Sequence, residues 1–521
     1  MTQSNFFHIV QIALFIGVYS LSGSAQAQFT PYDEIPGVIK SYKPAYSDSY
    51  PDWAKMLYQD QVNFNEIEAD YQAYMSTHPG GKNAIIRYYK IWRRAVESYV
   101  LDDGSIQLPD LNLYRENLLK AQREAPLIYK SGSDQQSNWT FLGPKQTFWL
   151  NSSGAQQAPL SCPWQVNVYS FDVAASNNEI LFAGAETGYV NKTSDGGRNW
   201  QLSGQGYPFG GGVTAVAIHP ENPDIVYVSA GSQIHKTIDA GLNWIPMLES
   251  SDLFAASRLI IDYSSPDKLI AAADKGIFIS TDGGDSWTKS WSTKTWDVEI
   301  KPDDNNVIYG ISASNGGVFE LTISRDGGAS FSKDDNFPAE HTNHSGALLA
   351  VTQANSNIIY ATMLVSEGEE QYAYIYKGTH SADSWTWELT KKGEPRSQAG
   401  LGGFSTGQGY FDYVLAVSPN NENTVFWGTC TLFKSTDGGV NFAKVGGYGG
   451  DFSIHPDIQD IKMLPNGNTW VATDGGMTLS SDDFTSTSNS YTRINGIVGS
   501  DMWGFDQGWN EDLFVGGRYH N

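Results

Sequence analysis

The pattern of apolar and polar positions changes character once along the chain, near residue 137. Before that point, apolar residues recur at close to helical spacing in three segments, 52–77, 83–100 and 111–125. After it, short apolar strands alternate with polar turns in a unit that repeats. The first strands of the units start near Phe171, Val213, Leu259, Trp296, Ala347, Val414 and Ile461. The pattern therefore predicts a small helical region over 28–136 and an all-β region over 137–521.

Five of the β units end in the motif [ST]-x-D-x-G-x-x-[WF]. The first four motif aspartates recur every 43 or 44 residues, the length of a four-stranded propeller blade. Seven units can be counted, and an eighth begins at 504–517. Either this piece closes the ring together with 139–142, or the sequence is cut short. We predict an all-β fold, a β-propeller of seven blades, or of eight blades if this last unit is a blade. The motif aspartates are Asp195, Asp239, Asp282, Asp326 and Asp437.

The motif is predicted to be structural. It falls in the turn between the third and fourth strands of a blade, where an aspartate carboxylate can accept hydrogen bonds from nearby backbone N–H groups. The glycine two residues later can adopt a positive φ, and the terminal Trp or Phe can pack between blades. We assign no catalytic role to the motif aspartates.

Charge and termini narrow the classes of function. The formal charge of -24, from 33 basic and 57 acidic residues, argues against a nucleic-acid partner and leaves glycans or proteins. An apolar run over 9–21 followed by Ala25-Gln26-Ala27 predicts a signal peptide over 1–27 and a secreted or cell-surface protein. No later segment is apolar enough to span a membrane. Cys162 and Cys430 either form a disulfide or remain two buried thiols.

The five motifs are identified as Asp-box, or BNR, repeats, and residues 139–521 resemble BNR/sortilin-like propellers. Sialidases, xyloglucanase-type glycoside hydrolases and sortilin-type receptors carry such repeats. Segments 407–428, 455–460, 472–477 and 515–521 resemble large secreted propellers of Bacteroidetes, the cargo of type IX secretion. This resemblance implies export, with attachment to the cell surface as one outcome. Where that group has H-x-D-x-H, this chain has His455-Pro456-Asp457-Ile458-Gln459.

Candidate chemistry lies at the heads of the inner strands. Counted back from the turn proline, Asp297 and Asp460 take the same place, Asp172 takes a comparable one, and Asp412 lies just before its strand. Carboxylates crowded at one axial opening can divide into an acid and a base, as glycoside hydrolysis requires. His455 and Asp457, with Asp460, could bind a divalent cation or a substrate. We predict no cofactor other than possible calcium. Further candidate ligand contacts are Tyr410, Trp503 and Arg518.

Two functions stay open. The first is a binding scaffold for a glycan or a protein, and the alternative is a glycoside hydrolase that uses channel carboxylates. Among the hydrolases, a sialidase is disfavoured because the Arg-Ile-Pro signature is missing. Residues 209–220 resemble the opening of xyloglucanases, but Ser-Ala-Gly-Ser-Gln at 229–233 stands where the resemblance places a catalytic aspartate.

Overall fold

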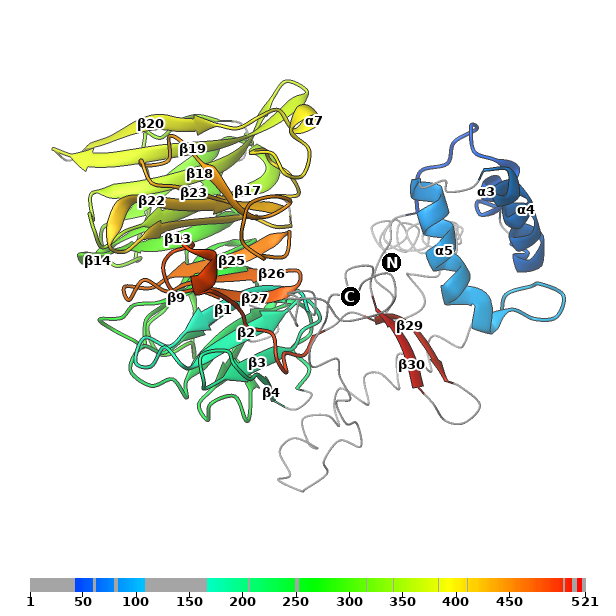
Figure 1. Cartoon of the computed structure of the whole chain (residues 1–521), viewed down its shortest axis with the longest axis horizontal. Helices are drawn as coiled ribbons and strands as arrows, with labels where there is room; N and C mark the ends of the chain where they lie inside the picture. The colour runs from blue at the N-terminus through cyan, green and yellow to red at the C-terminus, as the bar shows by residue number, and fades with distance from the viewer. Residues whose placement is uncertain are drawn as a thin grey trace, which may run out of the picture. The chain divides into compact units, whose positions relative to one another are not determined.

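The computed structural model describes two compact units, Met1–Gln136 and Ser137–Asn521, each considered by itself (Figure 1). Within them the structure describes the following residues: 43–59, 62–78, 83–107, 166–204, 207–248, 253–314, 316–340, 342–382, 384–409, 411–499, 502–507 and 513–517. The predicted signal peptide and the predicted helix over 111–125 lie outside these residues.

The first unit is helical. It contains α3 (Asp52–Met56), α4 (Phe64–Thr77), α5 (Ala84–Val96) and the 3-10 helix η1 (Glu97–Tyr99). The helical pattern over 52–77 is thus two helices and not one. A new helix, α4, starts after Asn63, whose side chain caps it by accepting a hydrogen bond from the N–H of Glu66. Asn83 caps α5 in the same way. The core is aromatic and includes Trp53, Tyr71, Tyr89 and Trp92.

The second unit is a propeller of seven four-stranded antiparallel sheets (Figure 1). Each sheet takes its four strands in sequence order, so every blade is one continuous piece of chain. The first blade has β1 (Val168–Val173), β2 (Leu181–Ala185), β3 (Val190–Thr193) and β4 (Gln201–Ser203). The second has β5 (Val213–Ile218), β6 (Val226–Ala230), β7 (Gln233–Thr237) and β8 (Ile245–Pro246). The third has β9 (Ala256–Ile261), β10 (Leu269–Ala273), β11 (Gly276–Ser280) and β12 (Thr288–Trp291).

The other four blades repeat this plan. The fourth has β13 (Thr295–Lys301), β14 (Asp304–Ala313), β15 (Phe319–Ser324) and β16 (Ser332–Lys333). The fifth has β17 (Thr342–Val351), β18 (Ile358–Glu367), β19 (Glu370–Ser381) and β20 (Ser384–Lys392), followed by α7 (Arg396–Ala399). The sixth has β21 (Val414–Ser418), β22 (Asn421–Gly428), β23 (Thr431–Ser435) and β24 (Ala443–Gly447). The seventh has β25 (Ile458–Met463), β26 (Thr469–Thr473), β27 (Gly476–Ser480), the 3-10 helix η2 (Thr487–Asn489) and β28 (Ser490–Thr492).

Seven blades close the ring. The first strands are neighbours around the axis, and β1 contacts β25 directly. Each blade keeps its own four strands, and hydrogen bonds from both backbone and side chains hold this junction. The N–H of Trp200 donates to the carbonyl of Asn495 at 2.8 Å, the Trp200 indole donates to the carbonyl of Arg493 at 3.0 Å, and the Asn191 amide makes two hydrogen bonds of 2.8 Å with the backbone of Val498. The predicted eighth unit is a separate two-stranded sheet, β29 (Met502–Gln507) and β30 (Leu513–Gly517), so the ring does not need it.

The aspartate turns connect the third and fourth strands of their blades. In the turn of Asp195, one carboxylate oxygen accepts from the N–H of Asn199 at 2.9 Å and from the hydroxyl of Thr193 at 2.8 Å. The same bonds recur around Asp239, Asp282, Asp326 and Asp437. The glycine two residues on has a positive φ in each turn, +74° at Gly197 for example. Hydrogen bonds from Ser330 lower the pKa of Asp326 to about 2.

The degenerate motifs behave differently from one another. In the seventh blade, Asp482 accepts from the hydroxyl of Ser480 at 3.0 Å and from the N–H of Ser486 at 3.0 Å, so the turn survives without its glycine. In the fifth blade, Ser381 at the end of β19 pairs with Ser384 at the start of β20, and Asp383 lies outside the described residues.

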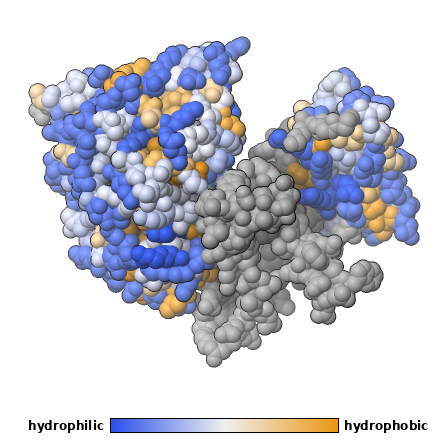
Figure 2. Space-filling view, viewed as in Figure 1, coloured by the Kyte–Doolittle hydropathy of each residue, from blue (hydrophilic) through white to orange (hydrophobic). Residues whose placement is uncertain are grey.

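The propeller surface in view is largely hydrophilic, with apolar residues scattered over it (Figure 2). Within the described ranges, no helix has the length and apolar character needed to cross a membrane.

Candidate functional site

The first strands of all seven blades enclose a central channel. A cavity of about 290 Å³ is lined by residues of all seven strands, and a second of about 650 Å³ lies toward the ends of the same strands. Both are lined by Arg258, Glu299, Asp460 and Lys462. These volumes are near or within the range of small-ligand pockets, about 300–1,000 Å³. The channel is therefore a candidate site with charged groups where the two cavities meet.

Asp297 ties two blades together at the channel. One of its oxygens accepts from its own neighbour, the N–H of Val298, at 2.9 Å, and the other accepts from the N–H of Leu349 in β17, also at 2.9 Å. The side chain is buried, and the guanidinium of Arg258 lies 3.5 Å from it. The carboxylate thus joins the first strands of the fourth and fifth blades.

Asp460 and Asp172 repeat this arrangement at other junctions. Asp460 accepts from the N–H of Ile461 at 2.8 Å and from the N–H of Phe171 in β1 at 3.1 Å, which joins the seventh blade to the first. Asp172 accepts from Val173 at 2.9 Å and from Ile218 in β5 at 2.8 Å. Three of the seven junctions between first strands therefore carry an aspartate that bonds both blades.

The place of Asp172 differs from the one inferred from sequence. In the strand pairing, Asp172 lies opposite Phe182, the second residue of β2, as Lys462 lies opposite Trp470, the second residue of β26. Asp460 lies opposite Ala472, two residues further along β26. Asp172 is therefore equivalent in position to Lys462 and not to Asp460. The sequence alignment of this strand is wrong by two residues because β1 is not followed by the turn proline that fixes the alignment of Asp297 and Asp460.

Two cations balance the channel acids in part. Arg258 donates to Glu299 at 2.8 Å, and Lys462 pairs with Asp172. Burial raises the pKa of Asp297 to about 7, against the opposing charge of Arg258. Burial likewise raises the pKa of Asp460 to about 6 and raises that of Glu299. At neutral pH the channel can therefore hold both protonated and ionised carboxyl groups.

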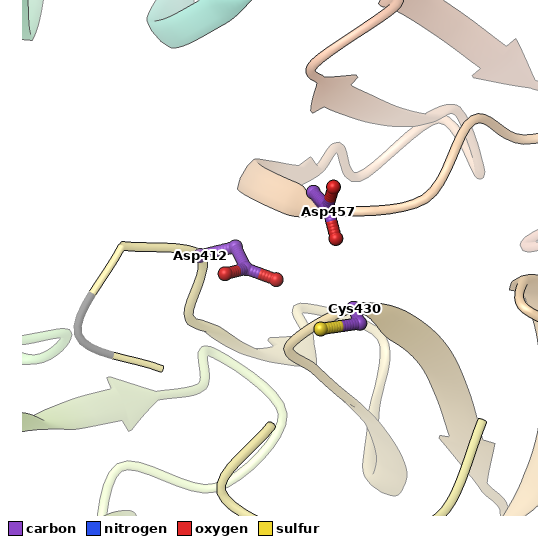
Figure 3. Close-up of side chains that lie close together, drawn as sticks. All are labelled: Asp412, Cys430 and Asp457. Atoms are coloured by element: carbon purple, nitrogen blue, oxygen red, sulfur yellow. The ribbon is translucent and has the colours of Figure 1, made fainter. Parts of the chain in front are cut away.

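Asp412 lies outside the group of channel acids, in a second cluster of side chains. Its neighbours there are Cys430, in the turn between β22 and β23, and Asp457, just before β25. One donor atom from each residue lies within 4.8 Å of the others, and all three residues are buried. Figure 3 shows the three side chains pointing toward one another from separate segments. We call Asp412, Cys430 and Asp457 the carboxylate–thiol cluster.

The carboxylate–thiol cluster is electrostatically unusual. Asp412 is completely buried, and neither of its carboxylate oxygens has a hydrogen-bond partner. Burial, and next the charge of Asp457, raises the pKa of Asp412 to about 9. Burial and the same carboxylates raise the pKa of the Cys430 thiol. Asp457 has a φ of +66°, a conformation that is uncommon outside glycine.

The remaining predicted residues are placed as follows. His455 is buried, and its Nδ1 lies 2.8 Å from the carbonyl of Pro456. It is not one of the three cluster residues. Cys430 is a free thiol here, while Cys162 lies outside the described residues, so the disulfide stays a prediction. Tyr410 and Arg518 also lie outside them, and of Trp503 only the backbone in β29 is described.

The structure brings Asp297 and Asp460 to one channel and places Asp412 with Asp457 elsewhere. Sequence reasoning did not select Arg258, Glu299 or Lys462, although alignment of the first strands would have placed Arg258 level with Asp297 and Asp460. From the sequence, Cys430 is either a disulfide partner or a buried thiol. Its position two residues after β22 gave no indication of a carboxylate neighbour, because Asp412 and Asp457 come from other turns.

Comparison with known proteins places the fold. No family model matches the chain. A curated "Xyloglucanase" from Paenibacillus sp is 25% identical over 215 residues, which cover 39% of this chain and 20% of that protein. The chain thus spans about a fifth of this relative's length. The crystal structure of the GH74 xyloglucanase from Xanthomonas campestris is similar, with a TM-score of 0.52 at 15% identity over 66% of this chain and 56% of that one.

A GH74 enzyme from Niastella koreensis gives a TM-score of 0.48 at 18% identity, over 68% of this chain and 59% of that one. The seven four-stranded sheets make the chain a seven-bladed β-propeller, and the Xanthomonas campestris structure shows that its fold resembles that of a GH74 xyloglucanase.

Proposed function

We propose that the chain is a carbohydrate-active propeller of the glycoside-hydrolase type, with Asp297 and Asp460 as its acid–base pair. The observation that carries the proposal is that one channel cavity holds both carboxyl groups, with pKa values raised to about 7 and about 6. Glycoside hydrolysis needs one carboxyl group protonated and another ionised near the operating pH. The sequence similarity to a xyloglucanase supports xyloglucan and related glucans as the substrate class.

We propose the channel acids as the catalytic pair because this chain has no carboxylate at residues 229–233, where the resemblance to xyloglucanases places a catalytic aspartate. Residues 229–233 form the end of β6, a turn and the start of β7, and they contain no carboxylate. Because residues of all seven first strands line the channel, we expect a polysaccharide to approach Asp297 and Asp460 with one of its ends. We therefore expect release of short products from chain ends. The protein is also proposed to be exported, on the strength of residues 1–27.

The test is a hydrolysis screen of the mature chain on xyloglucan and related glucans. Asp297→Asn and Asp460→Asn should each lower turnover at least about 100-fold, the contribution of a general acid or base. Asp304→Asn, an exposed aspartate of the blade that holds Asp297, should not. Reducing ends should appear without a fall in viscosity. Absence of hydrolysis by the wild-type chain on every glucan would refute the enzyme.

A glycan-binding scaffold is the second candidate. It is favoured by the hydrogen bonds themselves, because both oxygens of Asp297 and of Asp460 already accept backbone N–H groups. Such a carboxylate stabilises a junction between blades whether or not it acts on a substrate. Saturable glycan binding without hydrolysis, lost when the channel cation Arg258 is replaced by Met, would favour this candidate.

A further inference from the structure

We propose that the carboxylate–thiol cluster of Asp412, Cys430 and Asp457 is a binding site for a divalent transition metal of the zinc class. The site is separate from the channel pair and does not depend on the proposed function. Its residues come from the segment before β21, the turn after β22 and the segment before β25. A bound ion would therefore link the sixth and seventh blades at one end of the propeller.

The unpartnered state of Asp412 is the first argument. Its two carboxylate oxygens are buried without a hydrogen-bond partner, and the side chain points toward Cys430 and Asp457 (Figure 3). A buried polar atom without a partner destabilises the folded protein, and a charged group does so more strongly than a neutral one. Native proteins rarely leave such groups unsatisfied, and a bound ion is one of the established explanations where they do. The Cys430 thiol interacts with this carboxylate and lowers the pKa of Asp412, but a thiol is a weak donor and burial, which raises the pKa, has the larger effect.

The geometry is the second argument. Tetrahedral bonds of about 2.0 Å to oxygen and about 2.3 Å to sulfur hold donor atoms about 3.3–3.6 Å apart. The donor atoms of the cluster lie within 4.8 Å of one another. Small side-chain rotations would therefore close them around an ion. Three protein ligands leave a fourth position for water or another ligand, which is the pattern of open zinc sites.

The donor chemistry selects the class of metal. Calcium and magnesium take oxygen ligands, and a thiolate is a poor ligand for either ion. One thiolate with two carboxylates suits a borderline ion such as Zn²⁺, for which Co²⁺ is a spectroscopic probe. With both carboxylates and the thiolate ionised, an ion of charge +2 would offset most of the buried negative charge. The same ionised groups without an ion would be strongly disfavoured.

The experiment is a titration of the metal-free, full-length protein with Co²⁺. We expect one equivalent to bind with a thiolate-to-cobalt charge-transfer band, and Zn²⁺ but not Ca²⁺ to displace it. The band should vanish in Cys430→Ser and persist in Cys162→Ser, since these are the only two cysteines. Asp412→Asn and Asp457→Asn should weaken binding at least about tenfold, whereas Asp451→Asn, an exposed aspartate nearby in sequence, should not.

The wild-type titration decides the matter even where a variant fails to fold, and circular dichroism checks the folding of each variant. Absence of the charge-transfer band in the wild-type chain would overturn the proposal. So would a band that survives Cys430→Ser, or full displacement of Co²⁺ by Ca²⁺. A Zn²⁺-dependent rise in Tm for the wild type, absent in Asp412→Asn, would give independent support.

Discussion

The junction between the first and seventh blades should be the weak point of the ring, and Trp200→Ala should expose it. Trp200 is only 4% exposed, and its indole donates to the carbonyl of Arg493. A buried tryptophan covers about 200 Å², which at about 25 cal/mol per Å² is worth about 5 kcal/mol. Measured losses for such truncations are about 3–5 kcal/mol. The lost hydrogen bond adds about 1 kcal/mol.

We therefore expect Trp200→Ala to lower the free energy of unfolding by about 4–6 kcal/mol, measured by urea denaturation. Trp244→Ala is the matched control, because Trp244 is 5% exposed and its indole donates to Ser203 at 3.1 Å. Trp244 lies between the first and second blades, which the chain itself connects. Hydrogen exchange should therefore accelerate in β1, β2, β26 and β27 for Trp200→Ala but not for Trp244→Ala.

The same exchange pattern in both variants, or a loss of less than about 2 kcal/mol for Trp200→Ala, would refute a closing role for the Trp200 indole. Either outcome would mean that backbone hydrogen bonds at the junction, and not the indole, keep the ring closed.

Two further predictions concern the aspartates. Asp239→Ala removes the acceptor of the Asn243 N–H and should lower the unfolding free energy by about 1–2 kcal/mol, as loss of a capping side chain does. Asp239→Asn keeps an acceptor oxygen and should lower it less. Equal losses in the two variants would contradict a stabilising role for the Asp239 hydrogen bond. The pKa of Asp460 is raised from 3.8 to about 6, so the stability it contributes is present below pH 4 and lost as pH rises through 6. Burial lowers the pKa of His235 to about 4, so the contribution of His235 to the unfolding free energy rises with pH. Urea denaturation must therefore compare wild type with Asp460→Asn between pH 4 and pH 7, because His235 is present in both proteins and its contribution cancels. Wild type should lose up to about 3 kcal/mol relative to the variant over that range, and a relative gain would contradict the shift.

The candidate sites could be predicted from the sequence only in part. Asp297 and Asp460 were found because turn prolines mark equivalent places in repeated strands. Their hydrogen bonds to Leu349 and Phe171 could not be found, because those residues belong to neighbouring blades. Asp412 was grouped with the channel acids on the same argument, whereas the structure places it beside Cys430 and Asp457.

The sequence by itself determined the repeat, the blade length and the aspartate turns, because each of these depends on residues close together in the chain. A turn aspartate and the N–H groups it accepts from are only a few residues apart. The closure at seven blades, the charged channel and the carboxylate–thiol cluster were decided only by tertiary structure. Each brings together residues from different blades, such as Asp460 and Phe171, and no local pattern specifies which blades meet.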